Sequence, residues 1–224
     1  MQALVHVIDT KTQDCIGWGA KHVIFAAPQM LAKYVIRGFP ETEGRDFSKF
    51  SYGSWLVANI HLHDRPMSQG FPLCWDNVIY DSKSLGYITS THQAGSDFGP
   101  TVLTWYYPFA EEQPKKTRQR MLQLDWSDWV ELVLADLRVA HPEIDTLVDR
   151  VDIMLWGHAM VQPHVGFVWS DARQRAAEPL GPVHFAGTDL SGIALLEEAF
   201  YHGNRAAEEV LEALGVPFES ALSG

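Results

Sequence analysis

The 224-residue sequence has few cysteines, few basic residues and no long apolar run. Its two cysteines, Cys15 and Cys74, show neither CxxC spacing nor the density of a secreted disulfide scaffold. Lys and Arg number 17 against 28 Asp and Glu, and this net charge of −11 argues against a nucleic-acid partner. No apolar run reaches transmembrane length and no signal-peptide pattern opens the chain. We therefore expect a cytoplasmic protein without a membrane span.

Several kinds of functional site also lack their sequence signals. The Gly-x-Ser-x-Gly motif of serine hydrolases is absent. His61 and His63 have a spacing that can hold a metal, but no cysteine or carboxylate pair completes a ligand set, so we expect no metal site. The G-x-G-x-x-G motif that cradles a dinucleotide is absent too, since the only G-x-G, Gly17 to Gly19, lacks the third glycine.

The composition that remains, 46% hydrophobic and 20% charged, is that of a globular chain with one large or two small domains. Its first part predicts strands at Ala3 to Asp9 and Ile16 to Ala20. The apolar run His22 to Pro28 predicts a third strand, buried on both faces and ended by proline. A short helix is predicted over Gln29 to Ile36.

The middle of the chain predicts an antiparallel sheet with one aromatic-rich face. Residues Ser54 to Leu62 alternate as expected of a half-buried strand. One side would carry Leu56, Ala58, Ile60 and Leu62, and the other Trp55, Val57, Asn59 and His61. A helix is predicted from about Ser127 to Ala140, with Asp128 and Glu131 at capping-box spacing. Four further segments are predicted strands: Asn77 to Tyr80, Gly86 to His92, Thr101 to Tyr107 and Val151 to Leu155.

The most informative stretch is the C-terminal one. A short apolar strand, Val183 to Ala186, ends at Gly187, and a polar turn leads into a helical pattern from Ile193 to Leu214. A strand, a glycine turn and a helix N-terminus together present free backbone N–H groups and a positive dipole end. Such a site suits an anion or an electron-rich ring, although the same pattern also occurs in ordinary strand–turn–helix packing.

The amino-acid sequence of this stretch, FAGTDLSGIALLEEAFYHGNRAAEEVL, resembles the C-terminal flavin-binding motif of the flavin-containing amine oxidases. That family includes enzymes similar to phytoene desaturase and protoporphyrinogen oxidase. The chain departs from the pattern at Thr188, where the family usually has an acidic residue, and Asp189 follows one position later. The matching residues are Phe185, Ala186, Gly187, Gly192, Glu198, Ala199, Gly203, Ala206 and Ala207.

Two other segments resemble the same family. Residues His22 to Pro28 are similar to its VI-x-A-x-P crossover toward the substrate domain. Residues Asp152 to Pro163 are similar to its RWGHA-x-x-x-P segment, with Leu155 in place of the usual basic residue.

The resemblance implies an α/β fold. It would combine part of an FAD/NAD(P)-binding domain of the glutathione-reductase-like type with an α+β substrate domain built on an antiparallel sheet. Residues 1–30 would be a remnant of the FAD-binding domain, 31–155 the substrate domain, and 156–224 the C-terminal FAD-binding segment.

The resemblance also implies a cofactor and its contacts. FAD would be held non-covalently, since no cysteine lies just before the C-terminal motif. It would take hydride at N5 from a small-molecule substrate whose C–N or C–C bond is oxidised. Trp156 is the aromatic candidate beside the flavin, with plain core packing as its alternative. Catalytic residues are not assigned, although some members use a substrate-domain lysine, for which Lys83 is the position to inspect. The candidate cofactor-binding residues are Ala27, Pro28, Trp156, Gly187, Thr188, Asp189, Gly192, Ile193 and Ala194.

The resemblance covers only the C-terminal half of a family member. We therefore expect a missing or separately encoded N-terminal dinucleotide-binding half, without which this chain is inactive and binds FAD weakly or not at all. The alternative is a non-catalytic binding or interaction module that kept the sheet and lost the cofactor. Amines, carotenoid-like polyenes and porphyrinogens are all substrates of this scaffold, and the sequence does not choose among them.

Overall fold

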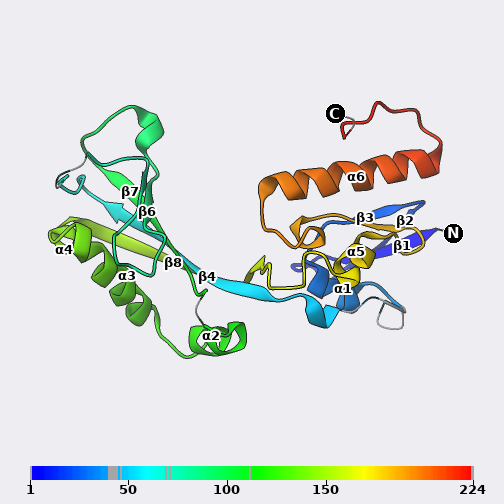
Figure 1. Ribbon diagram of the computed structural model, residues 1–224, viewed down its shortest axis with the longest axis horizontal. Coiled ribbons are helices and arrows are strands. Elements are labelled where there is room, and N and C mark those ends of the chain that lie inside the picture. Colours follow the sequence, from blue (N-terminus) through cyan, green and yellow to red (C-terminus); the bar gives the residue numbers. More distant parts are fainter. Residues whose placement is uncertain are drawn as a thin grey trace. The chain divides into compact units, whose positions relative to one another are not determined.

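The structure, a computed structural model, describes residues 2–39, 45, 47–68, 70, 72–110 and 112–222. It divides the chain into two compact units that both contain helices and strands (Figure 1). Unit 1 comprises Met1–Ser51 and Met160–Gly224, and unit 2 comprises Tyr52–Ala159. This mixture of helices with an antiparallel sheet is the predicted α/β class of fold. None of the described helices is both long and apolar enough to cross a membrane.

Unit 1 contains two small sheets. Strands β1 (Ala3–Ile8) and β2 (Cys15–Ala20) form an antiparallel hairpin, and β3 (Val23–Phe25) pairs in parallel with β9 (Val183–Phe185). The sequence predicted these four strands. Burial of β3 on both faces was wrong, because Ile24 is 41% exposed.

Two helix ends of unit 1 have recognisable caps. Ser170 accepts a hydrogen bond of 3.2 Å from the backbone N–H of Arg173 at the start of α5, and Gly215 ends α6 in the left-handed conformation. The elements are α1 (Gln29–Val35), α5 (Asp171–Ala177), α6 (Leu196–Leu214) and the 3-10 turns η1 (Phe47–Lys49) and η3 (Thr188–Leu190).

Helix α6 differs from its prediction in two ways. It begins at Leu196 rather than at Ile193, because the turn η3 and the left-handed Gly192 (φ 72°) occupy the preceding residues. None of the residues that predicted its apolar face is buried, and Leu196 and Phe200 are 81% and 68% exposed. Those residues are Ile193, Leu196, Phe200, Gly203, Ala207, Leu211 and Leu214. The side chains that α6 buries are those of His202 and Ala206.

Unit 2 is built on a five-stranded sheet in the order β5-β6-β7-β4-β8. The central pair is antiparallel, with Leu56 opposite Tyr107 and Ile60 opposite Leu103. The strands are β4 (Tyr52–Leu62), β5 (Asp76–Asn77), β6 (Tyr87–Thr89), β7 (Thr101–Pro108) and β8 (Val148–Val161), whose last two residues belong to unit 1.

One face of this sheet is the core face, and helices of unit 2 pack against it. The predicted alternation of β4 is confirmed, since Leu56, Ala58, Ile60 and Leu62 are all at most 2% exposed. Helix α3 contributes Trp129, Val133, Leu134 and Leu137 to the same hydrophobic cluster. The helices and turns of unit 2 are α2 (Pro114–Met121), α3 (Trp126–Ala140), α4 (Ile144–Leu147) and η2 (His92–Ala94).

Three details of unit 2 depart from the sequence prediction. The capping box of α3 joins Asp125 and Asp128, one turn earlier than predicted. The strand predicted over residues 77–80 keeps only Asn77, because β5 pairs with β6 through two residues and Val78 and Tyr80 turn to solvent at 79% and 88% exposure. The strand predicted over residues 151–155 is the middle of the much longer β8.

Candidate functional site

The parallel strands β3 and β9 bring two of the predicted site segments together in unit 1. Phe25 lies opposite Phe185, and the backbone N–H of Ala186 donates to the carbonyl oxygen of Phe25 at 3.0 Å. The residues that follow, Ala27 with Pro28 and Gly187, therefore leave the same carboxyl edge of this small sheet. Ligands of open α/β sheets bind at that edge.

Asp189 ties the two segments to each other. Its carboxylate oxygen Oδ2 accepts a hydrogen bond of 2.8 Å from the backbone N–H of Gln29, and the residue is 8% exposed. Pro28 is the N-cap of α1 and offers no side-chain acceptor, so Asp189 supplies one from the turn after β9. Thr188, at the position where the family usually has an acidic residue, begins that turn and is half-buried.

The two predicted glycines of the turn have different surroundings. Gly187 has φ 119° and ψ 164°, and a Cβ built on it would meet no described heavy atom within 4 Å. It leaves open space beside the backbone, which permits close approach of a ligand. A Cβ on Gly192 would instead lie 2.9 Å from Cε1 of Phe167, so this glycine is required by packing.

Backbone donors follow Gly192. Among the described residues, no acceptor pairs with the backbone N–H groups of Ile193 and Ala194, whereas that of Leu195 donates to the carbonyl of Ile193 at 3.0 Å. Glu197 and Glu198 occupy the first turn of α6 and offset part of its positive dipole end. The N–H groups of Ile193 and Ala194 are thus the donors that this turn presents.

A buried network beside the turn was not predicted from the sequence. The guanidinium Nε of Arg205 donates to Nδ1 of His202 at 3.2 Å, so the neutral ring carries its proton on Nε2 and donates to the Ser191 hydroxyl at 2.9 Å. Ser191 in turn donates to Glu198. Burial, followed by the charge of Arg205, lowers the pKa of His202 to about 4. His202 is therefore a donor to Ser191 and not a base that activates it.

Helix α6 also takes part in a second series of hydrogen bonds, which runs through two histidines outside the helix. Nδ1 of His184 lies 2.9 Å from the Glu209 carboxylate, which can only accept, so His184 donates there and its Nε2 accepts from Nδ1 of His22 at 3.1 Å. These contacts join α6 to β9 and to the residue just before β3. The sequence shows these histidines only as isolated residues. Their partners are distant along the chain, so no local pattern predicts the contacts.

Unit 2 offers an open sheet face opposite its core face. Trp55 and Tyr106 stack there with ring centroids 6.4 Å apart and planes 6° apart. The Tyr106 hydroxyl donates to Asp76 at 3.1 Å, and burial together with this carboxylate raises the pKa of Tyr106. The Thr104 hydroxyl donates to the side-chain oxygen of Asn59 at 2.8 Å. The predicted aromatic face of the antiparallel sheet is present.

The remaining predicted or considered residues lie elsewhere in unit 2. Trp156 is 52% exposed on β8, whereas the turn after β9 belongs to unit 1. Lys83 lines a cavity beside α3, away from the open face. His61 and His63 each contact an aspartate, at 3.0 Å and 3.3 Å. No group of three metal-ligating side chains occurs among the residues that the structure describes.

Comparison with known proteins now identifies the family. Residues 3–211 match the flavin containing amine oxidoreductases. The chain belongs to this family. Its members are oxidoreductases with FAD as cofactor, in agreement with the resemblance of the C-terminal stretch.

Solved structures of amine oxidases share the fold of the chain. Wild-type putrescine oxidase bound to putrescine has a TM-score of 0.62 and 16% identity, over 88% of this chain and 44% of the oxidase. Cyclohexylamine oxidase from Brevibacterium oxydans IH-35A has a TM-score of 0.60 and 16% identity, over 91% of this chain and 45% of the oxidase. The chain thus spans less than half the length of these two oxidases. No curated protein matches it.

Proposed function

We propose that this chain is the C-terminal part of an FAD-dependent amine oxidoreductase that removes hydride from a C–H bond of a small-molecule substrate and so oxidises the adjacent C–N or C–C bond. The observation that carries the proposal is the carboxyl edge of β3 and β9, where Asp189 ties the Gly187 turn to the start of α1. Bound flavin supplies a two-electron acceptor whose N5 takes the hydride.

The residues at this edge suit one side of such a cofactor. The open space at Gly187 admits a ring or chain against the backbone, and Ala27 and Pro28 leave the neighbouring strand without long side chains. The N–H groups of Ile193 and Ala194 are donors of the kind that stabilise negative charge on a carbonyl or ring-nitrogen edge. The sequence contains no G-x-G-x-x-G segment for the pyrophosphate.

The open face of unit 2 is the proposed substrate wall. Trp55 and Tyr106 present stacked aromatic surface, and such walls exclude water and orient apolar or cationic substrates. Asp76 holds the Tyr106 hydroxyl, which fixes that ring in place. Trp156, half-exposed on β8, is the further aromatic candidate.

Unit 1 also supports a proposed partner, a dinucleotide-binding half that carries the missing glycine-rich motif. Parallel sheets are normally covered on both faces, yet β3 and β9 form a sheet of two strands in which Ile24 is 41% exposed. Leu196 and Phe200 leave the apolar face of α6 to solvent, and Trp18 of β2 is 63% exposed. A strand and helix packed on these surfaces would complete the sheet and bury the apolar face.

The test compares the chain alone with the chain extended upstream in its own gene to include a strand–G-x-G-x-x-G–helix segment. The extended protein is expected to purify with flavin absorbance and to bleach with a suitable amine, whereas the chain alone binds FAD weakly or not at all. Gly187→Val is expected to lower FAD occupancy in the extended protein. Gly181→Val is the matched control, because Gly181 also has positive φ and open surroundings but lies outside the turn.

Two outcomes would contradict the proposal. Stoichiometric yellow protein from the chain alone would show that the proposed division of the cofactor site is wrong. The absence of any upstream glycine-rich segment, combined with no FAD binding, would favour a non-catalytic binding module that kept the sheet.

A further inference from the structure

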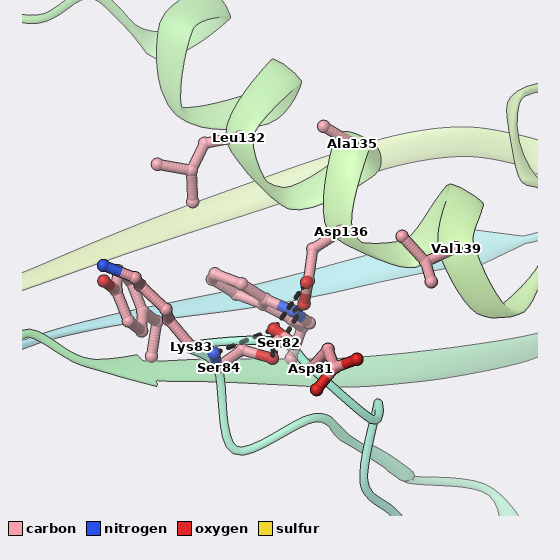
Figure 2. A pocket seen from close by; sticks show the side chains of 10 residues that line it. Asp81, Ser82, Lys83, Ser84, Leu132, Ala135, Asp136 and Val139 are labelled. Atoms are coloured by element: carbon pink, nitrogen blue, oxygen red, sulfur yellow. Dashed lines mark hydrogen bonds between the residues drawn. The ribbon is translucent and has the colours of Figure 1, made fainter.

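A cavity of about 360 Å³ lies in unit 2 beside α3, on the core side of the sheet. Figure 2 shows one wall made by α3, where Leu132, Ala135, Asp136 and Val139 are spaced by three, one and three residues and so share one helix face. The loop Asp81 to Ser84 forms the facing wall. The cavity thus lies on the opposite side of the sheet from the proposed substrate wall.

The loop is fixed to the helix through the Asp136 carboxylate. This carboxylate accepts hydrogen bonds from the Ser82 hydroxyl at 2.5 Å, the Ser84 hydroxyl at 2.7 Å and Nε1 of Trp105 at 2.7 Å (Figure 2). Three donors, one of them on a side chain that is 1% exposed, satisfy Asp136 within the fold. Asp136 therefore shapes the cavity and is not the group that would bind a charged ligand.

Asp81 is the carboxylate that stays available. It is exposed, and its side chain has no hydrogen-bond or ion-pair partner among the described residues. Its backbone has φ 62°, a left-handed conformation that costs about 1 kcal/mol outside glycine and is best tolerated by Asn and Asp. The anchored neighbour Ser82 holds it there, so the carboxylate is presented at the mouth of the cavity in a fixed backbone conformation.

The rest of the lining is apolar or aromatic. Val139 is 69% exposed and Leu132 is partly buried, and both stand on the α3 wall beside the rings of Trp105 and Tyr107. The charged lining groups are two carboxylates and one ammonium, that of Lys83, so the cavity has a net charge of −1. A carboxylate ligand would be repelled, and a neutral ligand would gain at most a hydrogen bond from Asp81, without the ion pair that an ammonium forms.

We propose that this cavity binds a small monocationic amine with a short apolar or aromatic body. The ammonium pairs with Asp81, and the body packs against Val139 and Leu132. The volume is within the range of small-molecule sites, about 300–1,000 Å³. The cavity and the proposed substrate wall lie on opposite sides of the sheet, so the cavity would bind an amine without oxidising it and does not depend on FAD.

The test is a titration of the full 224-residue chain with phenethylamine at neutral pH, followed by the Trp105 indole N–H signal in ¹H–¹⁵N spectra. That signal is assigned with Trp105→Phe, and it reports on the cavity because Trp105 bonds to Asp136. Phenethylamine is expected to shift it saturably. Of the ligands matched in size, 2-phenylethanol is expected to shift it only at much higher concentration, and 3-phenylpropionate is expected not to shift it.

Variants separate this site from general attraction of a cation to an acidic protein. Asp81→Asn tolerates the same backbone conformation and is expected to weaken phenethylamine binding roughly fivefold or more. Asp97→Asn, at another loop aspartate of unit 2, is the matched control and is expected to change nothing. Ala135→Trp, at an exposed position of the α3 wall of the cavity, is expected to fill the cavity and abolish the shift. Equal binding of the alcohol, unchanged binding by D81N or A135W, or no saturable shift would overturn the proposal.

Discussion

At the scale of single residues, the surroundings of His202 predict how the stability of the protein depends on pH. Its pKa is lowered to about 4 in the folded protein, from an ordinary value of 6.5, because the ring is buried and faces Arg205. Below pH 6.5 His202 binds a proton in the unfolded chain but not yet in the folded chain. Stability is therefore lost as the pH falls from about 6.5 to about 4, at about 1.4 kcal/mol for each pKa unit.

The measurement is urea unfolding of the wild type and His202→Gln at several pH values between 7 and 4. The wild type is expected to lose up to about 3 kcal/mol more than the variant across this range. His6→Gln, at an exposed histidine of unit 1, is the control and should follow the wild type. Parallel pH profiles for the wild type and H202Q would show that His202 titrates normally.

The sequence predicted some residues of the candidate site and missed others. Gly187 and Asp189 were found because they belong to one continuous motif. The bond from Gln29 to Asp189, and the path from Arg205 through His202 to Ser191, join residues that no local pattern connects. A spacing rule detects partners one helical turn apart, whereas a buried hydrogen bond between distant segments is decided by packing.

At the scale of elements, the prediction concerns the turn between β5 and β6. Gly86 has φ 86°, and a Cβ there would lie 1.9 Å from the carbonyl oxygen of Asn77. Gly99 has a similar φ of 78°, but a Cβ there would meet no described atom within 4 Å. Both alanine variants bear the cost of the left-handed conformation, about 1 kcal/mol, and only Gly86→Ala also clashes with backbone.

Gly86→Ala is therefore expected to lower the free energy of unfolding by at least about 2 kcal/mol more than Gly99→Ala. Urea unfolding followed by circular dichroism measures both. Recovery of G86A only as insoluble protein, beside soluble G99A, would agree with this expectation. Equal stability of the two variants would mean that the turn relaxes around the new methyl group.

Elements differ in how well the sequence predicted them. Strand β4 was predicted from Ser54 to its last residue, two residues short at its start, because its alternation matches a sheet with one buried face. Helix α6 was placed three residues too early, because periodicity does not register the left-handed Gly192 that interrupts the chain before it. Val78 and Tyr80 are apolar enough for a strand, but no strand of the described part of the chain pairs with them.

At the scale of the whole molecule, unit 2 contains the elements of an independent domain. Every residue of the large hydrophobic cluster lies between Leu56 and Val151. The two ends of the unit are joined inside it, because the guanidinium Nη1 of Arg118 donates to the carbonyl oxygens of Tyr52 at 3.3 Å and Gly157 at 3.2 Å. Unit 1, by contrast, is assembled from two distant parts of the chain.

A fragment of residues 52–159 is therefore expected to fold alone, with a dispersed ¹H–¹⁵N spectrum and a single cooperative urea transition. Within it, Leu137→Ala removes a side chain that is fully buried and should cost about 2–5 kcal/mol. Val139→Ala, on the same helix but 69% exposed, should cost far less. A fragment with a collapsed spectrum, or with equal effects of the two variants, would show that the core of unit 2 needs unit 1.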